Sequence, residues 1–130
     1  DSYLQGALVG TSPMGRLDRA ATQFFNFAVE QAKYYEILFL TMDHTVEHKV
    51  KGTLKKDAMQ SRKFMVERVM ECMADGSMKP DDPEEVALQL LSTCNGFFGL
   101  YVSKKVSGSR SEMKEKYDRM YKRLLAGLCT

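Results

Sequence analysis

The chain has 130 residues, of which 44% are hydrophobic and 28% are charged, and its formal net charge is +2. This length fits one domain with a single core, and the composition is ordinary for a soluble globular protein. The charge is too small to indicate nucleic acid or an acidic surface as a partner. No signal peptide is recognisable, and no apolar run approaches the ~20 residues needed to span a membrane. We therefore expect a cytoplasmic protein without membrane association.

The three cysteines, Cys72, Cys94 and Cys129, are widely spaced and form no CxxC pair. Cys72 and Cys94 fall within apolar stripes, which predicts reduced, packed thiols. The chain begins at Asp1 rather than at methionine, so we expect further residues upstream in the parent protein.

Apolar periodicity predicts an all-α helical bundle. Residues 1–11 are expected to be the remnant of a preceding helix or linker, and residues 12–130 the folded domain. Ser12 and Pro13 suit a helix N-terminus, and this helix is expected to run to about Phe39. Its apolar face consists of Leu17, Ala20, Ala21, Phe24, Ala28 and Ala32, flanked by Phe25 and Phe27.

The polar stretch after Phe39 predicts a short helix that ends near Gly52, followed by a separate helix over residues 54–74 that stops at Gly76. The inward face of that second helix is predicted to hold Ala58, Met59, Met65, Val66, Val69, Met70 and Met73. The last helix starts at Ser109, where Glu112 completes the form of a capping box. Its apolar face consists of Met113, Tyr117, Met120, Tyr121, Leu124, Leu125 and Leu128.

The helix that begins at Asp82 has two different faces. Asp82 is a good N-cap, Pro83 suits the first helical position, and Glu85 can close a capping box. At ~100° per residue, one broad face gathers Ala87, Leu90, Leu91, Cys94, Phe97, Phe98, Tyr101 and Val102. The opposite face is lined by small residues, namely Ser92, Gly96, Gly99 and Ser103.

Small side chains let another backbone approach closely. Two glycines inside a helix cost ~1 kcal/mol each relative to alanine, so we expect a compensating contact at Gly96 and Gly99. A helix covered on both faces needs neighbours on both sides, and one small domain does not readily supply them. This helix is therefore predicted to form an interface.

Three stretches, in this order, carry a resemblance to a known family: KYYEILFL at residues 33–40, ADGSMKPDDPEE at 74–85 and NGFFGL at 95–100. In them the chain resembles the C-terminal domain of TetR-family (tetracycline-repressor-type) transcriptional regulators. They are similar to the end of that family's fifth helix, the acidic-proline turn before its eighth helix, and the glycine-containing middle of the eighth helix. The resemblance covers roughly residues 12–128. Ala32-Lys33 departs from it, since many members have a proline there.

The family's N-terminal helix-turn-helix is absent from this chain. The resemblance therefore implies the effector-binding and dimerisation core of a repressor, which would contact DNA only through an upstream domain. In such proteins the last two long helices of each subunit form a four-helix interface, and a ligand shifts the spacing of the two DNA readers. We predict a homodimer built on residues 82–105 and 111–128. The predicted interface residues are Ser92, Gly96, Gly99, Ser103, Tyr117, Tyr121 and Leu124.

His44 to His48 matches the H-x-x-E-H zinc-peptidase pattern, whose two histidines can hold one metal. However, Val46 and Val50 supply the only apolar stripe of the segment, so the histidines are expected to face water. A catalytic site also needs a third ligand and a walled cleft. A solvated polar helix is the preferred interpretation, and adventitious metal binding is the alternative. No metal site, cofactor or catalytic residue is predicted, and the protein is not expected to be an enzyme.

Arg62 falls near the middle of the predicted apolar stripe of its helix, where a cation must pair or reach water. One interpretation is that Arg62 extends to the surface or pairs with an acid; the other is that it anchors a polar or anionic effector. Gln31, a polar residue near the apolar face of the first helix, is a weaker candidate for such an anchor. The predicted ligand-binding residues are Phe24, Phe27, Gln31, Arg62, Met65, Val69, Cys94 and Phe98. Nine methionines favour a pocket that adapts to an apolar or amphipathic effector.

Two hypotheses for the function remain. The first is the ligand-sensing and homodimerisation domain of a TetR-like repressor, in which a small, largely apolar effector releases the repressor from DNA. The alternative is a helical protein–protein interaction module without a small-molecule ligand. A closed apolar cavity beneath Phe24 and Phe98 would discriminate between them.

Overall fold

The computed structural model describes residues 12–35, 48–102 and 107–130. These residues form helices α2 (Pro13–Glu30), α3 (Ala32–Tyr35), α4 (His48–Ala74), α5 (Pro83–Val102) and α6 (Arg110–Leu128). Within these ranges the sole pairing of extended chain is an isolated antiparallel bridge between Met78 and Cys129. The predicted all-α helical bundle is therefore confirmed. None of the described helices has the length and apolar character that a membrane span requires.

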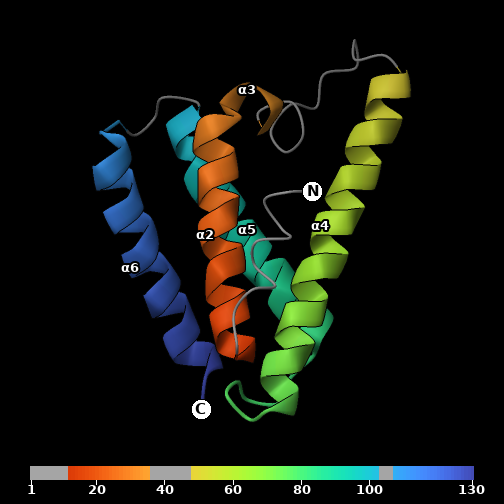
Figure 1. The fold of residues 1–130 in the computed structure, drawn as a ribbon, viewed down its shortest axis with the longest axis vertical. Coiled ribbons are helices and arrows are strands. Elements are labelled where there is room, and N and C mark those ends of the chain that lie inside the picture. Colours follow the sequence, from red (N-terminus) through yellow and green to blue (C-terminus); the bar gives the residue numbers. More distant parts are fainter. Residues whose placement is uncertain (1–11, 36–47, 103–106) are drawn as a thin grey trace.

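Helices α2 and α5 occupy the middle of the bundle. In Figure 1, α6 and α4 stand on the two sides of α2, and α5 crosses behind it. Each of α2 and α5 contacts the other and also contacts α4 and α6. The core therefore lies where these two helices pack against α4 on one side and against α6 on the other.

Helix α2 is shorter than expected. Ser12 caps it as predicted, because its Oγ accepts a hydrogen bond of 3.0 Å from the Gly15 N–H. At the other end Gln31 leaves the helical conformation, although its N–H still donates to the Phe27 carbonyl at 2.8 Å. A new short helix, α3, then starts at Ala32. Residues 36–39, over which one continuous helix was expected, lie outside the described residues.

Helix α4 corrects the prediction of two helices separated at Gly52. It runs without interruption from His48 to Ala74, so Gly52 lies inside it. An interior glycine costs only ~1 kcal/mol relative to alanine. The residues on both sides of Gly52 are mostly lysine, leucine and other helix-compatible types, and a continuous helix overcomes that cost.

The end of α4 at Gly76 is as predicted. Gly76 has a φ of +85°, in the left-handed region that glycine adopts without steric cost. Its N–H donates to the Met73 carbonyl at 3.3 Å, and the Met78 N–H reaches back to the Cys72 carbonyl at 3.0 Å. This turn brings Met78 into the core, where it is almost fully buried.

The two later helices begin at the predicted caps. The Asp82 Oδ1 accepts from the Glu84 N–H at 3.0 Å, and the Asp82 N–H donates to Asp81 at 2.7 Å. The Asp81 carboxylate therefore accepts from the Asp82 N–H, the donor that the predicted capping box pairs with the Glu85 side chain. At α6 the capping box between Ser109 and Glu112 is complete.

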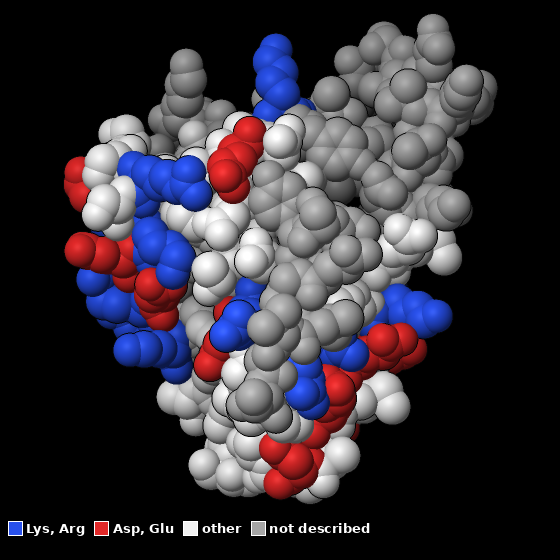
Figure 2. All heavy atoms as spheres, in the orientation of Figure 1, with Lys and Arg blue, Asp and Glu red and all other residues white. Residues whose placement is uncertain are grey.

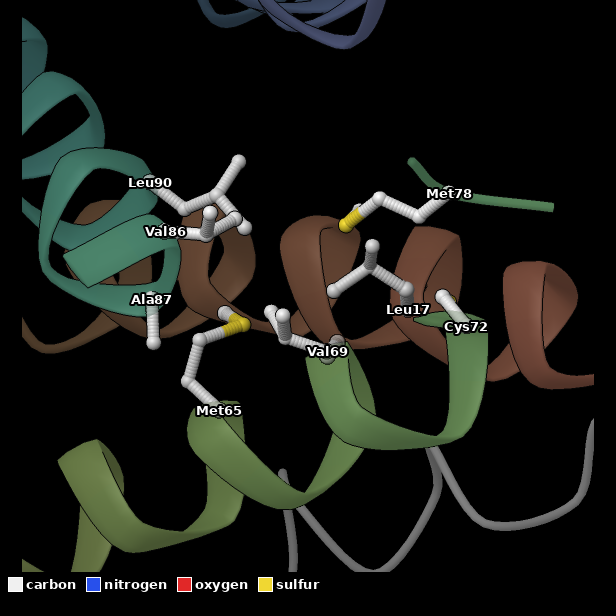
Figure 3. Packing of buried hydrophobic residues seen from close by; sticks show 9 residues of the cluster. Leu17, Met65, Val69, Cys72, Met78, Val86, Ala87 and Leu90 are labelled. Carbon is white, nitrogen blue, oxygen red and sulfur yellow. The ribbon is translucent and has the colours of Figure 1, made fainter. Parts of the chain in front are cut away.

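The first core cluster joins α2, α4, α5 and the turn between α4 and α5. Figure 3 shows Leu17 of α2 facing Val69 and Cys72 of α4, with Met78 from the turn above them. Val86, Ala87 and Leu90 come from α5. The cluster consists of Leu17, Ala20, Met65, Val69, Cys72, Met78, Val86, Ala87 and Leu90. The predicted apolar face of α5 is thus confirmed at Ala87 and Leu90.

The inward face of α4 is rotated from the predicted one. Met65 and Val69 are buried as expected, but Met59 and Met70 are 62% and 52% exposed. At ~100° per residue, the buried face is turned by roughly 60° toward Cys72 and Arg68. Counting Met59 and Met70 as inward caused the error, because apolar side chains also contribute much of a folded protein's surface and are not by themselves evidence of burial.

The chain end is fastened to the turn between α4 and α5. The Lys79 N–H donates to the Leu128 carbonyl at 2.9 Å, and the Thr130 N–H donates to the Ser77 carbonyl at 3.2 Å. These bonds flank the bridge of Met78 and Cys129. The last turn of α6 is therefore held to the same core as α4.

Gly76→Ala is expected to destabilise the fold, because an L-residue in the left-handed region costs ~1–2 kcal/mol. Gly127→Ala is the matched control. Gly127 is helical, a Cβ there would meet nothing within 4 Å, and alanine should add up to ~1 kcal/mol. Urea unfolding of both variants measures the difference, and equal unfolding midpoints would contradict this account of the turn.

Candidate functional site

The two predicted polar anchors, Gln31 and Arg62, are exposed. Gln31 follows the end of α2 instead of continuing its apolar face. Arg62 lies at an open hollow of about 400 Å³ between α4 and the start of α5, whose lining residues are Met59, Arg62, Lys63, Val66, Glu67, Met70 and Glu84. The exposure of Arg62 agrees with the interpretation that it reaches the surface and corrects its assignment as an internal effector anchor, because the inward face of α4 is rotated away from it.

The predicted apolar lining residues belong to two packed clusters. Met65 and Val69 lie in the first core cluster, whereas Cys94 and Phe98 lie in a second one. Phe24 is partly buried and packs against both clusters, and Phe27 packs against the second. The structure therefore divides the predicted lining residues between two core clusters and does not gather them around one ligand pocket.

Among the described side chains of α4, the buried cation is Arg68, which was not among the predicted site residues. Arg68 is 7% exposed, and its Nε donates to Glu71 Oε1 at 2.7 Å. Arg16 of α2 also bonds Glu71, with its Nη2 at 3.3 Å from Oε2, and the Arg68 guanidinium lies 4.6 Å from the Phe64 ring centroid. The spacing of Arg68 and Glu71, one helical turn apart, was the available signal. These contacts pair the charges and fasten α2 to α4.

The second core cluster is aromatic and joins α2, α5 and α6. Its buried residues are Phe25, Ala28, Cys94, Phe98 and Tyr117. The Tyr117 ring stacks on Phe98 with centroids 5.2 Å apart and an interplanar angle of 20°. Phe25 lies 5.2 Å from Tyr117, and Phe97 lies 5.5 Å from it. Tyr117 is thus the centre of these ring contacts.

The Tyr117 hydroxyl is buried and satisfied within the chain. It donates to the Ala21 carbonyl at 2.6 Å and lies 3.5 Å from the Cys94 Sγ. Burial raises the pKa of Tyr117 well above its usual value. Tyr117 is only 1% exposed, so its assignment to a dimer surface is corrected: the apolar face of α6 packs onto α2 and α5 of the same chain.

A second hydroxyl near this cluster is buried without a partner. Tyr101 lies one helical turn after Phe97, and their ring centroids are 5.0 Å apart at 46°. Among the described residues, the Tyr101 Oη is the one buried side-chain nitrogen or oxygen atom with no hydrogen-bond partner. Both rings keep part of their surface exposed. The periodicity of α5 predicts Tyr101 on an apolar face but does not indicate a partner for its hydroxyl.

The other predicted interface residues divide between surface and core. Ser92 and Gly96 are exposed, and Gly99 is half-buried. Tyr121 and Leu124 are half-buried; Tyr121 donates to Asp18 Oδ1 at 2.9 Å, and both pack against the first core cluster. Ser103 lies outside the described residues.

The exposed face of α5 is flanked by large apolar side chains. Leu88 and Leu100 are 51% and 48% exposed, and with Ser92 and Gly96 they recur every four residues. Residues at this spacing lie on one side of a helix. A Cβ added at Gly96 would meet nothing within 4 Å. We call Leu88, Ser92, Gly96 and Leu100 the α5 stripe; the described helices of this chain do not cover it.

Charged residues elsewhere are mixed in sign. Figure 2 shows lysine and arginine interleaved with aspartate and glutamate along the edge that α6 forms. A second open hollow of about 510 Å³ lies between α2 and α6. Two of its cations are already paired: Lys114 with Asp118 at 2.6 Å, and Arg110 with Glu30 at 4.0 Å. This face therefore presents no field of one sign.

The predicted histidine pair is not placed as a site. His44 lies outside the described residues, and His48 is described only as the first residue of α4. Within the described ranges, no group of three or more histidine, cysteine, aspartate or glutamate residues is arranged to hold a metal ion.

Comparison with known proteins gives one similarity of fold. No family model matches the chain, and no curated protein matches it. A solved structure of a protein of unknown function from Rhodococcus sp. RHA1 is similar, with a TM-score of 0.67 and 18% sequence identity. The match covers 99% of this chain and 65% of that chain, so this chain spans less than two thirds of its neighbour's length. At this identity the likeness shows the fold alone.

The buried thiol of Cys72 predicts a loss of stability at alkaline pH. Burial raises its pKa from 9.0 to about 11, so above pH 9 the unfolded chain loses a proton that the folded protein keeps. Stability is then full below pH 9 and falls as the pH rises, by at most ~1.4 kcal/mol per pH unit for one thiol. Burial also raises the pKa of Cys94, which adds in the same direction.

Urea unfolding midpoints measured from neutral pH to pH 11 check this prediction. They should stay constant up to pH 9 and then fall, and Cys72→Ala should make the fall less steep. A midpoint that does not change through pH 11 would contradict it.

Proposed function

We propose that this chain is the ligand-sensing and homodimerisation domain of a TetR-like transcriptional repressor, whose small, largely apolar effector releases the repressor from DNA. The observation that carries the proposal is the α5 stripe, which the described helices leave exposed. The resemblance of residues 12–128 to the family's C-terminal domain supports the remainder of the proposal.

The α5 stripe suits contact with a second copy of the chain. Gly96 lets a helix backbone come close. Leu88 lies two helical turns before Gly96 and Leu100 one turn after it, on the same face, so both can shield the contact from water. The interior glycines reduce the stability of an isolated α5, and burial against a partner would offset that cost. In a two-fold dimer each contact occurs twice, so a weakly apolar stripe still gains appreciable buried area.

The alternative is a protein–protein interaction module without a small-molecule ligand. The exposure of Gln31 and Arg62 favours it, because the two expected polar anchors do not point into the core. The division of the apolar lining residues between two packed clusters favours it too. Both functions use the α5 stripe, so a dimer alone does not discriminate between them, whereas ligand binding does.

Leu88→Glu is expected to weaken the homodimer by at least roughly tenfold in Kd, because the dimer would bury two unpaired carboxylates. Gly96→Leu should act in the same direction by blocking the close approach of a helix. Sedimentation equilibrium over a range of concentrations measures both effects.

Met70→Glu is the matched control for Leu88→Glu. Met70 on α4 is 52% exposed and Leu88 is 51% exposed, but Met70 lies outside the α5 stripe, so its variant should dimerise like the unmodified chain. A concentration-independent monomer for the unmodified chain would refute the dimer. Equal effects of the two glutamates would refute the α5 stripe as its interface.

The regulator part of the proposal is tested on the parent gene. If it is correct, the coding sequence upstream of Asp1 specifies a helix-turn-helix DNA-binding domain, and the chain without that domain shows no sequence-specific DNA binding. Nanomolar, sequence-dependent binding by the 130-residue chain at physiological salt would contradict it.

A further inference from the structure

The Tyr101 hydroxyl stands out when it is compared with the Tyr117 hydroxyl. Both tyrosines contact Phe97, with ring centroids 5.0 and 5.5 Å away. Tyr117 donates to the Ala21 carbonyl at 2.6 Å and lies beside the Cys94 thiol. Tyr101 has a buried Oη that bonds none of the described residues. The same aromatic region thus satisfies one hydroxyl and leaves the other unpaired.

An unpaired buried hydroxyl is costly, and native proteins keep few of them. A phenylalanine at position 101 would keep the ring contact with Phe97 and avoid the cost altogether. Such a group calls for an explanation, and one explanation is a ligand, because binding sites fix a ligand's orientation with a few placed polar groups such as a tyrosine hydroxyl.

We propose that Tyr101 is the hydrogen-bonding anchor of a small neutral ligand that packs its apolar body against Phe97. This inference rests on the proposed ligand-sensing function and gives that function an anchor in place of Arg62 and Gln31. Phe97 and Tyr101 are only partly buried, so a ligand reaches the hydroxyl by displacing partly exposed rings, without opening the fully buried stack of Phe98 and Tyr117.

The chemistry of the anchor defines the ligand class. A phenolic hydroxyl can donate one hydrogen bond and accept another, and it supplies no counter-charge. A charged head group without a counter-charge would be far more costly to bury than a carbonyl. A phenolic O–H donates readily to a carbonyl oxygen. The ligand is therefore an aromatic or aliphatic molecule with a single ketone, ester or similar acceptor, and not the anionic effector that Arg62 would select.

Two nearly isosteric probes, acetophenone and ethylbenzene, test the inference in ligand-observed NMR titrations of the 130-residue chain. The two differ by one carbonyl oxygen. The unmodified protein should bind acetophenone roughly three- to tenfold more tightly than ethylbenzene, the range expected for one neutral hydrogen bond. Tyr101→Phe should abolish that preference and leave ethylbenzene binding unchanged.

Tyr117→Phe is the matched control, because it removes a paired hydroxyl from the same aromatic cluster. It should keep the preference for acetophenone and lower the melting temperature. Tyr101→Phe should leave the melting temperature of the ligand-free protein unchanged or raise it by a few degrees, since it removes an unsatisfied group.

The outcomes separate the inference from the proposed function. Binding of both probes with equal affinity to the unmodified protein and to Tyr101→Phe would refute the anchor and leave ligand sensing intact. Binding of neither probe would overturn both and favour the interaction module. A melting temperature lowered by Tyr101→Phe as much as by Tyr117→Phe would show that the hydroxyl is already paired, and would also overturn the anchor.

Discussion

The buried Tyr117 side chain fastens α6 to the rest of the bundle, and its hydroxyl donates a hydrogen bond to the Ala21 carbonyl. It fixes α6 against α2 while the Tyr117 ring stacks on Phe98 of α5, so one side chain joins three helices. Because α6 turns its apolar face to its own chain, that face is no longer free for a partner. The opposite side of α5, which carries the α5 stripe, stays exposed among the described helices. The face of α5 that packs on α6 and the face that carries the α5 stripe are thus two different sides of one helix.

Local signals in the sequence predicted the helix ends well. Ser12, Asp82 and Ser109 cap helices, and Gly76 ends α4, because these features depend on a few neighbouring residues and on backbone geometry. Gly52 was misjudged because a single glycine has a small cost that the rest of a long helix can override. A turn is set locally, whereas the continuity of a helix depends on everything that the helix packs against.

The candidate site was less predictable than the fold, because it depends on which side of each helix faces inward. Including Met59 and Met70 in the inward stripe moved the predicted face of α4 and placed Arg62 at its centre. Arg68 is buried and paired with Glu71, which shows that a cation can lie at the edge of the core when an acidic residue one helical turn away pairs with it. A helical wheel gives the residues of a stripe but not the position of its centre when the flanking residues are flexible and apolar.

The contrast between Arg68 and Tyr101 separates structural polar groups from functional ones. Arg68 is buried with its charge paired, and it joins α2 to α4 through Glu71 and Arg16. Its role is therefore structural. Tyr101 contributes a ring to the packing, but its hydroxyl adds nothing to the described fold. A similarity of fold at 18% identity cannot distinguish these cases, since any helical bundle of this shape needs paired charges and packed rings. Function has to be argued from the groups that packing does not explain, and in this chain those are the hydroxyl of Tyr101 and the uncovered stripe of α5.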